Sequence, residues 1–171
     1  MLGITLVLAL VLVALAQPQA ATTQEREPVE VRFESYVVAA VTRADGGIDE
    51  VFTAADTANQ GDVIEYRLVV TNTTAAALPA VALVGPIPEF MTYVADSATP
   101  GSDWLRLEFS ADGGQSFSEP PVMITIVQAD GTRTQVVAAP ELYDAVRWTL
   151  LTPLEPNAAE PLTLTYRLTV D

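Results

Sequence analysis

Two residue types on which much of protein chemistry depends are missing from this chain of 171 residues, since it contains neither cysteine nor histidine. Without them the chain has no disulfide, no thiolate nucleophile and no Cys/His zinc site. The absence of imidazole also excludes a Ser-His-Asp relay. All 8 basic residues are arginine, so no lysine can form a Schiff base or bind phosphates in a P-loop.

Positive charge is also scarce, because 22 acidic residues face 8 basic ones and the formal net charge is −14. Phosphate contacts need cations, so this balance argues against nucleic acid and anionic membrane surfaces as partners. The remaining candidates for acid–base chemistry on a glycoside are paired carboxylates, Asp49 with Glu50 or Asp103 with Glu108. A domain of this size seldom offers the long cleft that this chemistry needs, so we expect no enzyme.

The start of the chain carries a targeting signal. Residues 2–16 are almost wholly apolar and end in Ala14-Leu15-Ala16, an A-x-A cleavage pattern. We therefore expect residues 1–16 to be a cleaved secretory signal peptide, and the chain to be exported to the periplasm, the cell surface or the extracellular space. The alternative is an uncleaved anchor, the one case in which the chain would contact a membrane, although a spanning helix needs about 20 apolar residues.

The rest of the chain is patterned for strands. After a segment rich in Ala, Thr, Gln and Glu at residues 17–28, which predicts a flexible leader, apolar and polar residues alternate repeatedly. The clearest alternation covers residues 162–170, and shorter ones cover residues 29–33, 64–70 and 146–150. This period of two is typical of strands that bury one face.

Turn signals separate these strands and set the fold class. Asp130-Gly131, which lies between residues 122–128 and 132–137, predicts a β-hairpin. The 12 prolines suit loops and edge strands, because proline cannot donate a hydrogen bond to a sheet. The pattern predicts an all-β domain at residues 29–171, an antiparallel immunoglobulin-like β-sandwich of about seven to nine strands behind an N-terminal signal peptide helix.

Three segments carry a family resemblance. Residues 59–73, NQGDVIEYRLVVTNT, combine a Gly-Asp turn, an alternating strand with tyrosine and a Thr-Asn-Thr end. Residues 86–94 read PIPEFMTYV. The sequence LEP at residues 154–156 precedes the long alternating run at residues 162–170.

In this order the segments resemble the conserved repeat of bacterial and archaeal surface proteins that is called domain of unknown function eleven. The resemblance covers about residues 37–171, with Gly85 and Phe90 where that pattern has Asp and Gly. It implies an immunoglobulin-like sandwich in an exported protein that serves as a stalk, an envelope component or an adhesin, and it implies no enzymatic activity.

Acidic side chains in two loops form a candidate calcium site. Ca²⁺ takes six to eight oxygen ligands from carboxylates and carbonyls, and loops at one end of a sandwich can supply them. The alternative is turn chemistry, because aspartate caps turns and tolerates unusual backbone angles. No other cofactor is indicated. The candidate ligands are Asp45, Asp49, Glu50, Asp56 and Asp62.

Exposed aromatic residues are the second group of candidates. The alternation after Trp104 places it with Arg106 on the outer face of a strand, unless the strand starts only at Leu105. An outward tryptophan could stack on a sugar ring or lie in a protein interface, and Tyr36 poses the same question. The alternative for Trp104 is a strand-end residue folded over the rim of the core, whereas Trp148 is predicted to lie in the core.

The sequence favours a non-catalytic exported structural or interaction module of the cell envelope, whose partner is itself or another envelope protein. As a self-assembling surface subunit it could add residues 29–41 to the sheet edge of a neighbour, or pack its acidic loops through calcium. The alternative is a monomeric secreted module that binds a glycan or protein ligand, or mediates adhesion, through Trp104 and the loops.

Overall fold

The computed structural model describes residues 27–55, 57–156 and 158–171, and this part of the chain contains ten strands and one short 3-10 helix. Every strand pair is antiparallel, which confirms the predicted all-β fold. The predicted signal peptide, residues 17–26 of the leader and Asp56 lie outside the described residues. The elements are β1 (Val29–Thr42), β2 (Ile48–Ala54), β3 (Val63–Asn72), β4 (Ala82–Pro86), β5 (Met91–Tyr93), β6 (Leu105–Ser110), β7 (Met123–Val127), β8 (Arg133–Val137), η1 (Pro140–Leu142), β9 (Ala145–Leu150) and β10 (Leu162–Val170).

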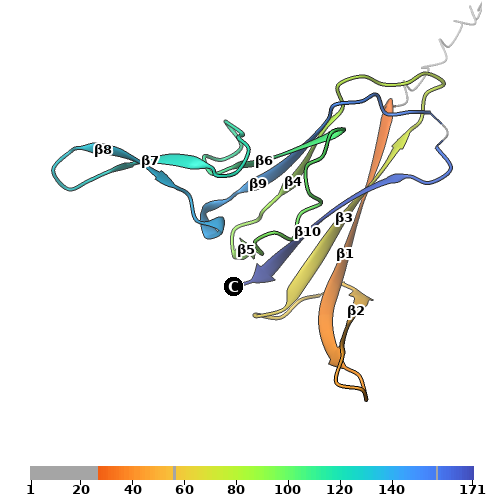
Figure 1. Ribbon diagram of the computed structural model, residues 1–171, viewed down its shortest axis with the longest axis horizontal. Coiled ribbons are helices and arrows are strands. Elements are labelled where there is room, and N and C mark those ends of the chain that lie inside the picture. Colours follow the sequence, from red (N-terminus) through yellow and green to blue (C-terminus); the bar gives the residue numbers. More distant parts are fainter. Residues whose placement is uncertain (1–26, 56, 157) are drawn as a thin grey trace, which may run out of the picture.

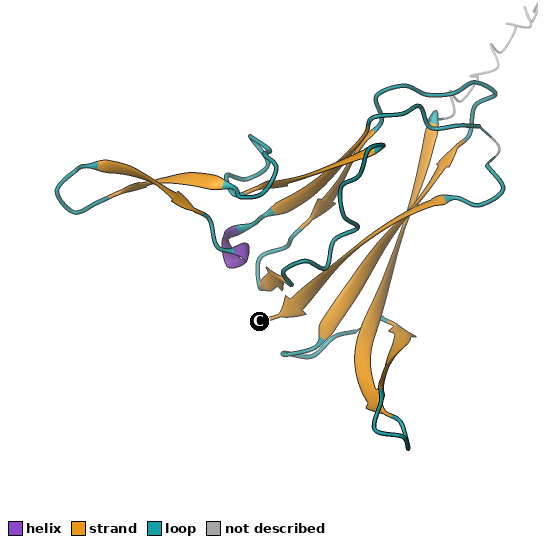
Figure 2. Cartoon of the chain, in the orientation of Figure 1, coloured by secondary structure: helices purple, strands orange, loops and turns teal. Residues whose placement is uncertain are grey.

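The strands form two facing sheets and a separate hairpin (Figure 1). The larger sheet has five strands in the order β2-β1-β3-β10-β5, and the smaller has three in the order β4-β9-β6. Strands β7 and β8 pair with each other and project away from the two sheets (Figure 2). The described residues hold ten strands, slightly more than predicted, partly because β5 is only three residues long and has no alternation to reveal it.

The core lies between the two sheets and is built by the alternating residues. On β10, Leu164, Tyr166 and Leu168 are at most 1% exposed, and their neighbours along the strand face outward. The predicted core residue Trp148 on β9 is fully buried opposite them. Because each large apolar side chain that is removed from water contributes roughly 1.5–3 kcal/mol, this interface is the main source of stability.

Two hydrogen bonds join the sheets across the core. The Tyr166 hydroxyl donates to the carbonyl of Pro86 on β4 at 2.8 Å, and the Trp148 indole Nε1 donates to the carbonyl of Thr99 at 2.9 Å. Burial raises the pKa of Tyr166, so its hydroxyl stays a donor. Gly85 allows this approach, since a Cβ there would lie 2.7 Å from the Tyr166 ring.

Strand β1 is long enough to pair with different neighbours along its two halves. Its residues 29–38 pair with β3, whereas only its residues 36–42 pair with β2. The segment that the sequence suggested as a donor for a neighbouring sheet therefore belongs to the chain's own sheet.

The buried Asn72 at the end of β3 lies opposite Val29 of β1 and organises the loop that follows β3. It donates to the carbonyls of Ala76 and Leu154, both at 2.8 Å.

The hairpin predicted at Asp130-Gly131 is confirmed. The amide of Gly131 donates to the Gln128 carbonyl at 2.9 Å, and the Asp130 carboxylate accepts from the amide of Thr132, also at 2.9 Å. Gly131 has a φ of 83°, which glycine adopts without the strain that a side chain would bring. We call residues 123–137 the β7–β8 arm.

Candidate interaction surfaces

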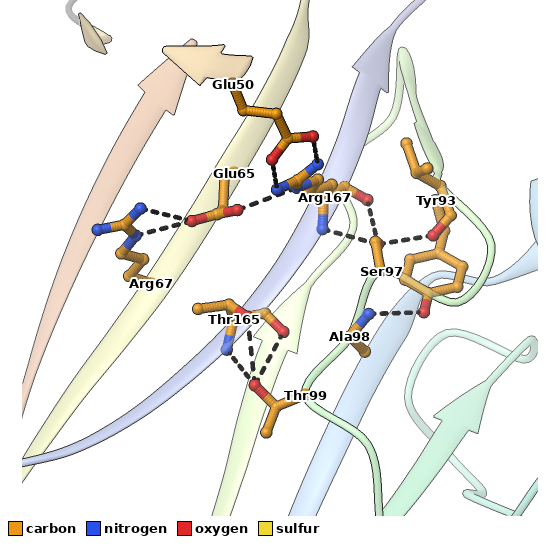
Figure 3. Close-up of polar contacts among 10 residues, drawn as sticks. Glu50, Glu65, Arg67, Tyr93, Ser97, Ala98, Thr99, Thr165 and Arg167 are labelled. Carbon is orange, nitrogen blue, oxygen red and sulfur yellow. Dashed lines mark hydrogen bonds and ion pairs between the residues drawn. The ribbon is translucent and has the colours of Figure 1, made fainter. Parts of the chain in front are cut away.

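A charged network crosses the outer face of the five-stranded sheet (Figure 3). Its centre is Glu65 on β3, which is only 6% exposed although it faces away from the core. The carboxylate accepts from Arg67 Nε at 2.8 Å and from Arg167 Nε at 2.9 Å. Two arginines therefore compensate one buried carboxylate, which satisfies the requirement that a buried charge be paired.

Strand β2 curls over this network and closes it. Glu50 on β2 accepts from both terminal nitrogens of Arg167 on β10 at 2.7 Å, although β1 and β3 separate the two strands in the sheet. The Phe52 ring lies 4.9 Å from the Arg67 guanidinium carbon and 5.8 Å from that of Arg167. The contact with Arg167 lowers the pKa of Glu50, and the same contact raises the pKa of Arg167.

Tyr36 belongs to the same surface. The Arg67 guanidinium carbon lies 4.5 Å from the centre of the Tyr36 ring, and the Tyr36 hydroxyl donates to Glu34 at 3.0 Å. That hydrogen bond, with partial burial, raises the pKa of Tyr36. The sequence singled out Tyr36 and Glu50 for different reasons, and the structure places both on this surface. Tyr36 contacts Arg67, and Glu50 contacts Arg167.

The other candidate calcium ligands are spread over separate turns. Asp45 and Asp49 lie 3.3 Å and 3.2 Å from Arg43 nitrogens, and Asp45 also accepts from a turn amide at 2.9 Å. Asp62 accepts from the amide of Asn59 at 2.7 Å. Within the described ranges no group of three or more His, Cys, Asp or Glu could hold a metal ion, and Asp56 lies outside these ranges. The contacts of Asp45 and Asp62 are turn chemistry, and calcium binding stays a prediction.

Trp104 and Arg106 lie on the other sheet, at the start of β6. The strand begins at Leu105, so Trp104 precedes it, and 41% of the Trp104 surface is exposed. The Trp104 carbonyl accepts from the amide of Leu151 at 2.8 Å, and Arg106 lies 3.4 Å from Glu119. Neither residue contacts Tyr36 in this arrangement, because the two surfaces belong to different sheets.

The carboxylate pairs that the sequence offered for acid–base chemistry have other partners. Glu108 is 8% exposed and accepts from Arg147 Nε at 3.0 Å, beneath a Phe117 ring that lies 4.2 Å from the arginine carbon. Asp49 and Glu50 contact two different arginines, as described above. Asp49, Glu50 and Glu108 are thus each paired with an arginine.

The β7–β8 arm carries a surface that the sequence pattern did not single out. Four large apolar side chains of the arm are exposed: Met123 at 47%, Ile126 at 42%, Val127 at 66% and Val137 at 60%. A depression of about 270 Å³ lies at its base, lined in part by Phe109, Asp112 and Met123. The signal for this surface was the presence of apolar residues on both alternating faces of the arm, where a half-buried strand has only one.

No protein-family model, curated protein or solved structure matches this chain. In the described residues, no helix is both long and apolar enough to span a membrane. The described residues thus present three separate surfaces, which are the charged network, the exposed Trp104 and the projecting β7–β8 arm.

Proposed function

We propose that this protein is a non-catalytic, exported structural or interaction module of the cell envelope. The observation that carries the proposal is the β7–β8 arm, which projects from the sandwich and exposes the four apolar side chains named above (Figure 1). An isolated two-stranded hairpin is marginally stable in water, and exposed apolar surface that gathers on one element is typical of sites of protein interaction. The arm therefore suits a partner that covers it.

Export is supported by the apolar residues 2–16 and their A-x-A end. The resemblance to the surface-protein repeat is supported by Phe90, which follows the Pro-x-Pro element. Phe90 has a φ of 70°, in the left-handed region that glycine favours, and the repeat pattern has glycine at that position. The side chain of Phe90 is 79% exposed, so it obtains no packing in exchange for this backbone conformation.

Expression of the full chain in a bacterium, followed by cell fractionation and intact-mass measurement, tests the proposal. We expect the protein in the envelope or the medium, with a mass that matches loss of residues 1–16, which leaves 171 − 16 = 155 residues. Replacement of Ala14 and Ala16 by bulky residues should block cleavage, because the processing enzyme needs small residues there. A chain of full mass that stays in the cytoplasm would refute the export on which the proposal depends.

A monomeric ligand-binding or adhesion module is the second candidate, and the exposure of Trp104 favours it. Trp104 lies beside Leu151, which is 48% exposed, so an aromatic and an aliphatic surface adjoin at the rim of the sandwich. Such a pair can stack on the apolar face of a sugar. A glycan array probed with the wild type and with Trp104→Ala tests it, and binding that survives the substitution would exclude this role.

A further inference from the structure

One edge of the five-stranded sheet is open over half of a strand. Strand β3 pairs with residues 29–38 of β1, but β2 pairs only with residues 36–42. In the described part of the chain, residues 29–35 thus have a neighbouring strand on one side only. The opposite edge of the sheet is covered, because β5 and residues 94–99 hydrogen-bond along β10, as with Thr99 and Thr165 in Figure 3.

The backbone groups at the open edge can be assigned from the strand geometry. The Ser35 carbonyl accepts from the amide of Ala55 at 2.9 Å, so Ser35 directs its backbone groups toward the side of β2. Residues along a strand alternate between the two neighbours. Val31 and Phe33 therefore direct their N–H and C=O groups to the open edge, where an added strand can use them.

The side chains at this edge are apolar on one face. Val31 and Phe33 lie opposite Val70 and Leu68 of β3, on the face that forms the core. They are nevertheless 38% and 51% exposed, whereas Val70 and Leu68 are each 1% exposed. In Figure 1, β1 lies on the side of β3 that is away from the three-stranded sheet, and the buried core residues include Leu68 and Val70 of β3 but neither Val31 nor Phe33.

The other face of the same segment carries alternating charge. Glu30, Arg32 and Glu34 point outward, and Arg32 lies 3.0 Å from Glu34 with 65% of its side chain exposed. An arginine with a glutamate two residues before it is complementary to the same segment placed antiparallel. In such a pair, Glu30 of each chain faces Arg32 of the other.

We propose that the open edge of β1 pairs antiparallel with the same edge of a second copy of this chain, with Val31 opposite Val31 of the second copy. This deepens the proposed function and rests on it, because it names the chain itself as one partner of the module. In this register Val29 faces Phe33 of the second copy, and about six backbone hydrogen bonds join two five-stranded sheets into one.

The charges and the chain geometry select this register. A shift that places Val31 opposite Phe33 would bring Arg32 against Arg32 and Glu30 against Glu34, and like charges directly opposite are destabilising. A shift that centres the pair on Phe33 would need the carbonyl of Ser35, which already accepts from Ala55.

The other edge strands β2, β4 and β6 of the two larger sheets are less suited to self-pairing. Strand β2 has only acidic charged residues, Asp49 and Glu50, so an antiparallel copy would meet repulsion. Strand β4 ends in Pro86, which cannot donate to a ladder. Strand β6 is partly occupied by bridges from Ser102 and Ser118.

A single engineered cysteine tests the register directly, because the chain has no other cysteine. Residues in a hydrogen-bonded antiparallel pair have Cα atoms about 5.5 Å apart, within the range of a disulfide. On mild oxidation of the purified full chain, Val31→Cys should form a disulfide dimer at least about tenfold faster than Phe33→Cys, which lies roughly four residues out of register with itself. Val84→Cys, at an exposed position on β4, is the control for random collision.

Charge exchange tests the same contact without a covalent bond. By sedimentation equilibrium, Glu30→Arg and Arg32→Glu should each weaken dimerisation about tenfold, because each creates two like-charge contacts across the two-fold axis. The double variant, which exchanges the two charges, should restore the wild-type association. A structural role for either residue within one chain would not produce this restoration.

The outcomes separate this inference from the proposed function. Fast disulfide formation at Val31 together with restored association in the double variant supports the paired edge. Cross-linking at Val31 no faster than at Val84, faster cross-linking at Phe33, or no restoration would overturn it. These measurements use purified protein and do not depend on export, so a chain that is exported but does not pair refutes only this inference, and a chain that pairs but stays in the cytoplasm refutes only the proposed function.

Discussion

The protein contains two β-hairpins, of which one packs against the five-stranded sheet and the other projects from the sandwich. The β1–β2 hairpin curls back over the sheet, where Glu50 binds Arg167 and Phe52 covers two arginines. The β7–β8 arm extends from the other side (Figure 2), and among the described residues its two strands pair only with each other. Both are antiparallel ribbons closed by an Asp-Gly turn, and local sequence alone makes them alike. The difference shows that a hairpin packs on a sheet when it carries side chains, here Glu50 and Phe52, that contact charged groups of that sheet.

The largest effect on this comparison should come from the centre of the charged network. Glu65→Ala leaves Arg67 and Arg167 side by side without the carboxylate between them, and loss of one partner of a buried ion pair costs about 3 kcal/mol. Urea unfolding should show a corresponding decrease in the free energy of unfolding. Thr163→Ala on the same face of β10 is the control, and an equal loss in both variants would contradict the role given to Glu65.

Removal of the cover should have a smaller effect that is local to one hairpin. Phe52→Ala takes away the ring above both guanidinium groups, and we expect a loss of about 1–2 kcal/mol in unfolding free energy. Limited proteolysis should then cleave the β1–β2 hairpin faster while the arm is unaffected. Ile48→Ala, on the same strand but 71% exposed, should change stability by less than about 0.5 kcal/mol.

Acid should loosen the two hairpins to different extents. Arg167 lowers the pKa of Glu50 below its ordinary value of 4.5, and a backbone amide lowers that of Asp130 in the arm. A carboxylate with a lowered pKa contributes stability that is fully present above its unfolded-state pKa and lost as the pH falls through the folded-state value. Protonated Glu50 releases β2 from β10, whereas protonated Asp130 affects only its own turn.

Hydrogen exchange measured at pH 7 and at pH 3 checks this expectation. Exchange in β2 should accelerate more at low pH than exchange in β7 and β8, after correction for the intrinsic rates. Between about pH 6 and pH 8 the free energy of unfolding should stay constant, since the chain has no histidine or cysteine side chain to titrate there. A transition of stability within that range would show that another group controls it.

The smallest effect on stability should come from the arm itself. Val127→Ser changes a side chain that is 66% exposed and contributes little to the core, so the free energy of unfolding should change by at most about 0.5 kcal/mol. Retention of the protein in the envelope fraction should nevertheless fall if the arm binds a partner there. Thr125→Ser, at a neighbouring position of the arm, is the matched control, and equal retention of both variants would show that the arm is not the contact.

Much of the fold could be predicted because strand formation leaves a local record. The alternating residues of β10, β3 and β9 identified strands and their buried faces, including Trp148, and Asp130-Gly131 located a hairpin. The short β5 was missed because three residues show no period. The orientation of Trp104 could not be predicted, because it depends on whether the strand includes Trp104. In the structure the strand starts at Leu105, the next residue.

The candidate sites were harder to predict, because their partners are distant in sequence. Glu50 was considered as a calcium ligand on the basis of its neighbours in the loop, but it contacts Arg167, which is 117 residues away. Glu65 looked like an ordinary solvent-facing residue of an alternating strand, but in the structure it is buried and paired with Arg67 and Arg167. The contacts of Tyr36 arise for the same reason, since Arg67 reaches its ring across the sheet.

The sequence by itself determined the longer strands with their inward faces, the sharp turns and the excess of negative charge, because each depends on neighbouring residues or on composition. Only the tertiary structure decided which outward charges are buried, which hairpin docks and which strand edge stays open. Those features depend on contacts and strand pairings between residues that are distant in the sequence, such as Glu50 and Arg167. In the described part of the chain, the edge of residues 29–35 is open because β2 stops pairing at Tyr36.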